Sequence, residues 1–253
     1  MNIADDLLLA LDPVRLAEAA GIEPDDWQRD VLRSAAAAIL LNVTRQGGKS
    51  TISAVLALHD ALFIPNSLVL LLSPSLRQSS ELFKKVMHVY NGVGRPIAAA
   101  EESALQLRLT NGSRVIALPG KEGTIRGFSG VSRLIVDEAS RVRDDLYRAI
   151  RPMLAVSRGK IICLSTPFGK RGFFHAEWTG TGDWQRVGVP ATACPRISPT
   201  FLAEERAAIG EWFYRQEYLC SFEETIDQVF SYDDVMGALS DDVTPLFAPS
   251  IGV

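Results

Sequence analysis

The chain has 253 residues, of which 47% are hydrophobic and 22% charged, and its net charge at pH 7 is −4. These values are ordinary for a folded globular domain and exclude a low-complexity chain or one attracted to nucleic acid by its overall charge. The acidic start, Met1–Leu11, lacks the basic residues of a signal peptide, and no apolar run reaches the roughly 18 residues of a membrane span. We therefore expect a cytoplasmic protein without membrane contact. Three widely separated cysteines argue against a disulfide framework or a zinc site.

Helical and extended segments alternate along most of the chain. Two segments near the start, Asp5–Ala19 with a break at Pro13 and Pro24–Leu32, have the apolar spacing of helices. Further on, short apolar runs typical of strands buried on both faces are separated by helical segments. The expected strands are Ala36–Val43, Ser67–Ser73, Arg133–Val136 and Lys160–Leu164, and the expected helices between them are Ser50–Phe63, Leu76–Val89 and Asp144–Leu154. This alternation favours an α/β fold with a mainly parallel, doubly wound sheet.

A β-hairpin is expected within this series. Ala104–Leu109 and Arg114–Leu118 alternate polar and apolar residues on either side of Asn111-Gly112. Asn-Gly supplies the positive φ angles of a tight turn, which predicts antiparallel pairing of the two segments.

The pattern changes beyond Trp184, where strand-like runs give way to helical, aromatic-rich sequence. Phe201–Gly210 and Trp212–Phe222 are the two helices expected there. We therefore divide the chain into a core at residues 1–190, a small helical lid or linker subdomain at 191–235 and a tail at 236–253.

The first expected strand leads into a helix through the sequence NVTRQGGKST, residues 42–51. Its two glycines allow several backbone N–H groups to point at one anion, and the helix N-terminus adds positive potential. Lys49 would then reach the β- and γ-phosphates of ATP, and the Ser50 hydroxyl would bind Mg²⁺. Val43 occupies the first glycine position of the strict pattern, so an ordinary turn with an exposed lysine is the alternative. The expected phosphate-loop residues are Arg45, Gln46, Gly47, Gly48, Lys49, Ser50 and Thr51.

The third apolar strand ends in two carboxylates, in the sequence RLIVDEAS at residues 133–140. In an open α/β sheet the carboxyl ends of the strands face the ligand crevice. Asp137 would hold Mg²⁺ there, directly or through water, and Glu138 would polarise the attacking water. Adjacent acids are common on surfaces, but the apolar residues before this pair and the phosphate loop upstream favour a site. A phosphate loop followed by such a pair is typical of the branch of P-loop NTPases with a catalytic glutamate, the ASCE type.

The fourth expected strand ends in the sequence STPFGKRGFF, residues 165–174. The Thr166 hydroxyl would lie beside the γ-phosphate and could report its loss through a hydrogen bond. A plain strand-to-helix turn is the alternative.

Two of these motifs resemble those of terminase large subunits, the motors of viral DNA packaging. TRQGGKST is similar to the variant phosphate loop of that family, which lacks the first glycine and contains an arginine, and STPFGKRGFF is similar to its coupling motif. The resemblance extends from about Trp27 to Phe230. It implies an N-terminal ATPase domain that hydrolyses ATP with Mg²⁺ and powers translocation of double-stranded DNA into a procapsid.

The resemblance also implies roles for further residues. Arg45 would contact the γ-phosphate in cis, and Gln28, next to Trp27, would read the adenine edge. Arg126, in a glycine-flanked loop, is our candidate for an arginine finger that acts on a neighbouring subunit. The alternatives are a solvent-facing Arg45, an amphipathic helix with Trp27 in the core, and a structural salt bridge at Arg126.

The family implies a portal protein and a small terminase subunit as partners, a homo-oligomeric ring (a pentamer) and a location in the host cytoplasm. Terminases also carry a C-terminal nuclease, but only about two dozen residues follow Phe230. We therefore expect an isolated motor whose tail, residues 236–253, leads to an absent nuclease, and no DNA cleavage. A superfamily-2 helicase-like or DNA-remodelling ATPase is the alternative, although it needs a second motor domain. A non-catalytic nucleotide-binding module is disfavoured by the presence of Lys49 and Glu138.

Overall fold

The computed structural model describes residues 3–119, 127–224 and 237–238. The helices of this part are α1 (Ile3–Leu11), α2 (Pro13–Ala19), α3 (Asp26–Leu32), α4 (Lys49–Phe63), α5 (Leu76–Gly92), α7 (Asp144–Ile150), α8 (Gly172–Thr179), α9 (Pro199–Ile209) and α10 (Glu211–Glu217). The strands are β1 (Ala38–Val43), β2 (Leu68–Ser73), β3 (Ala99–Glu102), β4 (Gln106–Leu109), β5 (Arg114–Pro119), β6 (Arg133–Asp137), β7 (Lys160–Ser165) and β8 (Gln185–Val189). No described helix has the length and apolar character needed to cross a bilayer.

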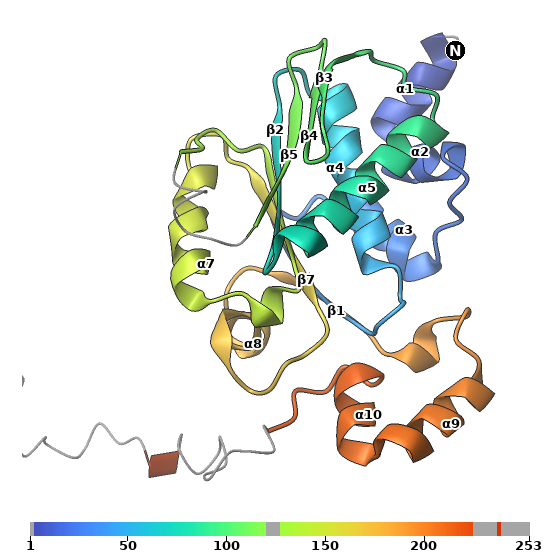
Figure 1. Cartoon of the computed structure of the whole chain (residues 1–253), viewed down its shortest axis with the longest axis vertical. Helices are drawn as coiled ribbons and strands as arrows, with labels where there is room; N and C mark the ends of the chain where they lie inside the picture. Colours follow the sequence, from blue (N-terminus) through green and yellow to red (C-terminus); the bar gives the residue numbers. More distant parts are fainter. Residues whose placement is uncertain (1–2, 120–126, 225–236, 239–253) are drawn as a thin grey trace, which may run out of the picture.

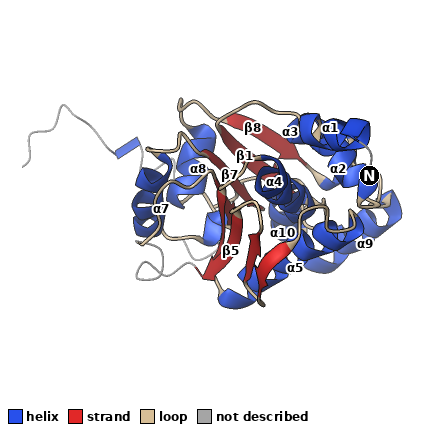
Figure 2. Ribbon diagram, turned by 90° about the horizontal axis from the view of Figure 1, so that it is seen from above, coloured by secondary structure: helices blue, strands red, loops and turns tan. Residues whose placement is uncertain are grey.

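Within the described part of the chain, the eight strands form one sheet in the order β3-β4-β5-β2-β6-β7-β1-β8. In this order, each neighbouring pair from β5 across β2, β6, β7 and β1 to β8 is parallel. The pairs β3-β4 and β4-β5 are antiparallel. Helices α1 to α5 cover one face of the sheet, and α7 and α8 cover the other (Figures 1 and 2). The predicted doubly wound α/β fold and the hairpin at Asn111-Gly112 are confirmed. Helix α8 and strands β3 and β8 were not predicted.

Both faces of the central strands are buried, as their continuous apolar sequences indicated. Along β2, Val69 and Leu71 belong to the hydrophobic cluster under α4 and α5. Leu68, Leu70 and Leu72 belong to the second cluster, under α7 and α8. Successive side chains of a strand point to opposite faces, so each central strand is held by two cores.

The helical segment after β8 forms a small unit of its own at the end of β1 (Figure 1). Helices α9 and α10 form where helices were predicted and pack around Ala191, Leu202 and Tyr214. We call α9, α10 and the residues from 191 to 224 the lid, and its boundaries as a separate domain remain a prediction. The asparagine of β1, Asn42, donates to the carbonyl of Cys220 at 2.9 Å, which ties the lid to the core.

A buried ion pair joins α4 to β6. The Arg133 guanidinium donates to both carboxylate oxygens of Asp60, at 2.8 and 3.0 Å. The two side chains are only 6% and 7% exposed. Removing one member leaves a charge in the core without its partner, which is far more costly than losing a surface pair.

We expect Asp60→Ala to lower the free energy of unfolding by about 3–5 kcal/mol, measured by urea denaturation. As a control, Glu81→Ala removes the exposed pair with Lys84 and should cost less than about 1 kcal/mol. The double variant Asp60→Leu/Arg133→Met removes both charges and should recover part of the loss. A single variant as stable as the wild type would contradict this role for the pair.

Candidate nucleotide-binding site

The phosphate loop connects β1 to α4 and depends on its two glycines. Gly48 has a φ of 90°, in the left-handed region, and a Cβ there would lie 2.6 Å from the Nε2 atom of Gln28. A Cβ on Gly47 would lie 2.7 Å from the Val43 side chain. Any side chain at either position therefore collides with a neighbour, and at Gly48 it is also strained.

Lys49 is the first residue of α4 and is 7% exposed. Its Nζ donates to the carbonyls of Val43 and Thr44 at 3.3 and 3.4 Å, which keeps the ammonium against the loop. Burial lowers the pKa of Lys49, and the nearby carboxylates of Glu138 and Asp137 oppose that shift. The Lys49 ammonium thus lies directly beside the backbone of the phosphate loop.

Asp137 lies at the end of β6, directly opposite the start of α4. Its Oδ2 accepts a hydrogen bond from the Ser50 hydroxyl at 3.4 Å, and its Oδ1 accepts one from the Glu138 backbone N–H at 3.0 Å. Burial raises the pKa of Asp137 to about 6, and the charge of Glu138 adds to the shift. The structure therefore brings the two predicted metal ligands together.

The donor set at Ser50 and Asp137 fits Mg²⁺. This ion prefers hard oxygen ligands and commonly takes one or two from the protein, the rest being water and phosphate oxygens. Among the described residues no group of three or more His, Cys, Asp or Glu side chains is arranged to hold a metal. A metal site made by the protein and the nucleotide together is consistent with both observations.

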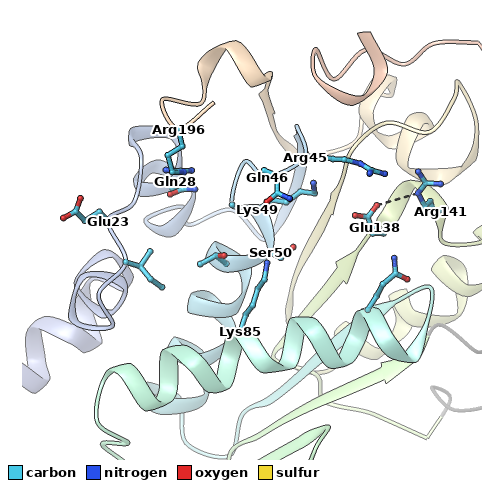
Figure 3. A pocket seen from close by; sticks show the side chains of 14 residues that line it. Glu23, Gln28, Arg45, Gln46, Lys49, Ser50, Lys85, Glu138, Arg141 and Arg196 are labelled. Carbon is cyan, nitrogen blue, oxygen red and sulfur yellow. Dashed lines mark ion pairs between the residues drawn. The ribbon is translucent and has the colours of Figure 1, made fainter. Parts of the chain in front are cut away.

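Glu138 follows Asp137 and has a φ of 51°, an unusual value for a residue other than glycine. This conformation ends the strand and starts the short 3₁₀ helix Ala139–Arg141. The Glu138 carboxylate extends toward Arg141, with 3.8 Å between Oε2 and Nε (Figure 3).

These elements surround a cavity of about 950 Å³ at the carboxyl ends of the strands (Figure 3). Its lining residues are Ile22, Glu23, Gln28, Arg45, Gln46, Gly48, Lys49, Ser50, Thr51, Gln78, Lys85, Glu138, Arg141 and Arg196. Eight of the predicted site residues are in this set. Asp137 and Gly47 lie just behind it, bonded to Ser50 and Gln28.

Two predicted residues lie elsewhere. Thr166 is 1% exposed and does not line the cavity, and its carbonyl accepts a hydrogen bond from the Ser140 hydroxyl at 2.8 Å. The predicted sensing of phosphate by its hydroxyl therefore needs a rearrangement. Arg126 lies outside the described residues, so its role as a finger remains a prediction.

Arg45 and Gln28 line the cavity but have partners in the protein. The Arg45 Nε atom lies 2.6 Å from the Glu217 carboxylate of α10. The Gln28 amide donates to the Gly47 carbonyl at 3.1 Å and accepts from the Asp25 N–H at 2.9 Å, which links α3 to the phosphate loop. Their predicted contacts with the γ-phosphate and adenine remain predictions.

Five polar residues of the cavity were missed in the sequence: Glu23, Gln78, Lys85, Arg141 and Arg196. Gln78 and Lys85 lie seven residues apart on one face of α5, a spacing that could have been noticed. Among the described residues Lys85 has no ion pair, and its side chain extends from α5 toward Ser50 (Figure 3). Arg196 comes from the lid, where it pairs with Asp25 at 2.6 Å. Neither Arg196 nor Arg141 carries a local sequence signal.

Known proteins resemble this chain over most of its length. The large terminase subunit of Thermus virus P23-45 is 25% identical over 255 residues, which cover 87% of this chain and 53% of the relative. The ATPase domain of the Thermus phage P74-26 large terminase has a TM-score of 0.74 at 22% identity, over 84% of this chain and 99% of that domain. The large terminase of bacteriophage D6E in complex with ATP-γ-S has a TM-score of 0.66 at 13% identity, over 78% and 52%.

The structural likenesses confirm the predicted P-loop ATPase fold. This chain spans about half the length of the curated relatives it matches. A model of the N-terminal part of the terminase large subunit, T4-like-virus type, matches residues 40–236, which is more than half of the chain. The chain therefore belongs to the terminase large-subunit family and corresponds to its N-terminal region.

Proposed function

We propose that this chain hydrolyses ATP with Mg²⁺ and that the reaction drives double-stranded DNA into a viral procapsid. The observation that carries the proposal is the convergence of Lys49, Ser50 and the Asp137–Glu138 pair on one cavity. These groups supply a cation, a pair of metal ligands and a carboxylate able to act as a general base. The D6E large terminase, which shares the fold, has been solved with ATP-γ-S.

In this proposal each residue has a separate task. Lys49 and the backbone N–H groups of the loop from Gln46 to Thr51 hold the β- and γ-phosphates. Ser50 and Asp137 hold Mg²⁺, which neutralises charge on the phosphates. Glu138 orients the attacking water and accepts its proton.

Arg45 links the nucleotide to the lid. The Arg45 side chain is 61% exposed, whereas that of its partner Glu217 is only 15% exposed. A γ-phosphate offers a guanidinium more charge and more acceptor oxygens than a single carboxylate does. Binding of ATP would therefore draw Arg45 from α10 and loosen one contact between the loop and the lid.

The partners follow from the family. We propose double-stranded DNA, a portal protein and a small terminase subunit, with the chain in a homo-oligomeric ring in the host cytoplasm. Arg126 would complete the site of a neighbouring subunit. Mixing Arg126→Ala with Glu138→Gln subunits tests this proposal, because mixed rings would regain some activity that neither variant has alone.

The first test separates binding from hydrolysis. Lys49→Ala should weaken ATP binding by about 10- to 100-fold, because it removes charge-assisted hydrogen bonds. Glu138→Gln should retain binding and lose hydrolysis by about 10²-fold or more. Binding of a fluorescent ATP analogue and phosphate release would be measured. Lys84→Ala, on the outer surface of α5, and Glu101→Gln, on the exposed edge strand β3, serve as charge-matched controls. Hydrolysis by Glu138→Gln at the wild-type rate would exclude Glu138 as the base.

The second test uses the pKa of Asp137. Its value of about 6 lies above the usual 3.8, so without nucleotide the folded state loses stability as the pH rises through 6. Asp137→Asn should thus stabilise the apo protein by about 2–3 kcal/mol at pH 8 and by much less at pH 4.5. Urea denaturation at both values would measure this difference.

The same variant should lose the additional stability that Mg²⁺ and ATP give to the wild type. Asp183→Asn, an exposed substitution of the same kind, should leave both quantities unchanged. If Asp137→Asn destabilised the apo protein at pH 8, Asp137 would be a structural carboxylate and not a ligand held in readiness for a cation.

A further inference from the structure

Arg141 lies between the nucleotide cavity and the loop that follows β7. It lines the cavity, and its Nε is 3.8 Å from the Glu138 carboxylate. On its other side, the guanidinium carbon lies 4.0 Å from the centre of the Phe168 ring. The side chain is one-third exposed, so the ion pair alone would not fix its direction.

Phe168 supplies the second contact that orients the guanidinium. Arginine stacks on an aromatic face through its planar group, and this contact holds both the position and the plane of the cation. Arg171 lies over the same ring, 4.6 Å from its centre. Two guanidinium groups therefore contact this ring, and of the two Arg141 is the one that lines the cavity.

The backbone beside Arg141 is tied to the same loop. The Ser140 hydroxyl bonds to the hydroxyl of Ser165 at 2.6 Å and to the carbonyl of Thr166 at 2.8 Å. The short segment that carries Glu138 is thus connected to the end of β7 by both Ser140 and Arg141. The end of β7 and the loop after it are therefore in direct contact with the segment that carries Glu138.

We propose that Arg141 is a positioning residue for Glu138 and that its stacking on Phe168 makes hydrolysis depend on the loop after β7. Arg141 holds the carboxylate at one orientation from the side, and Phe168 holds Arg141. The inference rests on the proposed function, because it assigns Glu138 as the general base. Through Arg141, the loop after β7 influences hydrolysis without any contact between Thr166 and the nucleotide.

A double-mutant cycle tests this route. Arg141→Gln should lower kcat by about 10- to 100-fold, up to the loss expected for a missing base. Phe168→Leu keeps an apolar side chain without the π face and should lower kcat by roughly 3- to 10-fold. The double variant should be no slower than Arg141→Gln alone, because Phe168 acts through Arg141. Phe168→Trp keeps the stacking face and should retain most of the wild-type rate.

Arg151→Gln is the matched control, since Arg151 stacks on Tyr147 and Trp184 away from the cavity. It should leave kcat unchanged. Binding of a non-hydrolysable ATP analogue is measured in parallel and should change far less than kcat in the Phe168 variants. Multiplicative losses in the double variant, or an Arg141→Gln effect confined to ATP affinity, would overturn the inference.

The experiments distinguish a failure of the proposed function from a failure of this inference. If the wild type and Glu138→Gln hydrolyse ATP equally, Glu138 is not the base and the proposed site is wrong. If Glu138→Gln is inactive while Arg141→Gln and Phe168→Leu turn over at the wild-type rate, the ATPase assignment stands and only the positioning role is lost.

Discussion

The parallel register of β1, β7 and β6 determines the site. Asn42 of β1 is paired with Ser165 of β7, and Leu164 of β7 is paired with Asp137 of β6, so the three strands end at one level. Ser50 and Asp137, which are 87 positions apart, are thereby brought within hydrogen-bond distance of each other. The two hydrophobic clusters hold this register from both faces, because a slip of one residue would exchange the side chains of the two cores.

Charge in and beside the cavity is arranged in arginine–carboxylate pairs. Arg45 is matched by Glu217, Arg141 by Glu138 and Arg196 by Asp25. The arginines of these pairs are between one-third and two-thirds exposed, whereas their carboxylate partners are 13% to 27% exposed, so solvent reaches the cations more readily than the anions. Phosphate groups entering the cavity would compete for these cations, with more charge and more acceptor oxygens. The pairs thus keep the cations in place and leave them available.

Local signals in the sequence were sufficient for the central part of the fold. The continuous apolar runs predicted β1, β2, β6 and β7 to within two residues at either end, and the phosphate loop and acidic pair were recognised because each is contiguous. The two edge strands, β3 and β8, were not predicted, and the reason is physical. Ala99–Glu102 is mostly exposed and directs only Ala99 at the core, and Gln185–Val189 directs only Val187 and Val189 there, so neither apolar pattern is long enough to predict a strand.

The site was less predictable where it depends on tertiary packing. Arg196 reaches the cavity from the lid, about 150 positions after the phosphate loop, and no spacing rule relates the two. Arg141 and the neighbouring exposed Arg143 are alike in the sequence, and only the tertiary contacts of Arg141 place it in the cavity lining. Thr166 also depends on packing, since it is buried, lies outside the cavity lining and accepts a hydrogen bond from Ser140 through its carbonyl, while the contact of its hydroxyl with the phosphate remains a prediction.

The lid contacts both sides of the site through polar groups. On the β1 side the Thr44 hydroxyl donates to the Glu217 carbonyl, and on the β7 side Lys170 pairs with Glu224 at 3.3 Å. The Glu224 carbonyl in turn accepts from the Trp212 indole of α10. The lid has a small hydrophobic core, but it also packs on the main cores, since Cys194 belongs to the cluster under α4 and α5 and Phe222 packs against the cluster under α7 and α8. These contacts join the phosphate loop and the loop after β7 through one unit, so a shift of either loop would have to be accommodated by the lid.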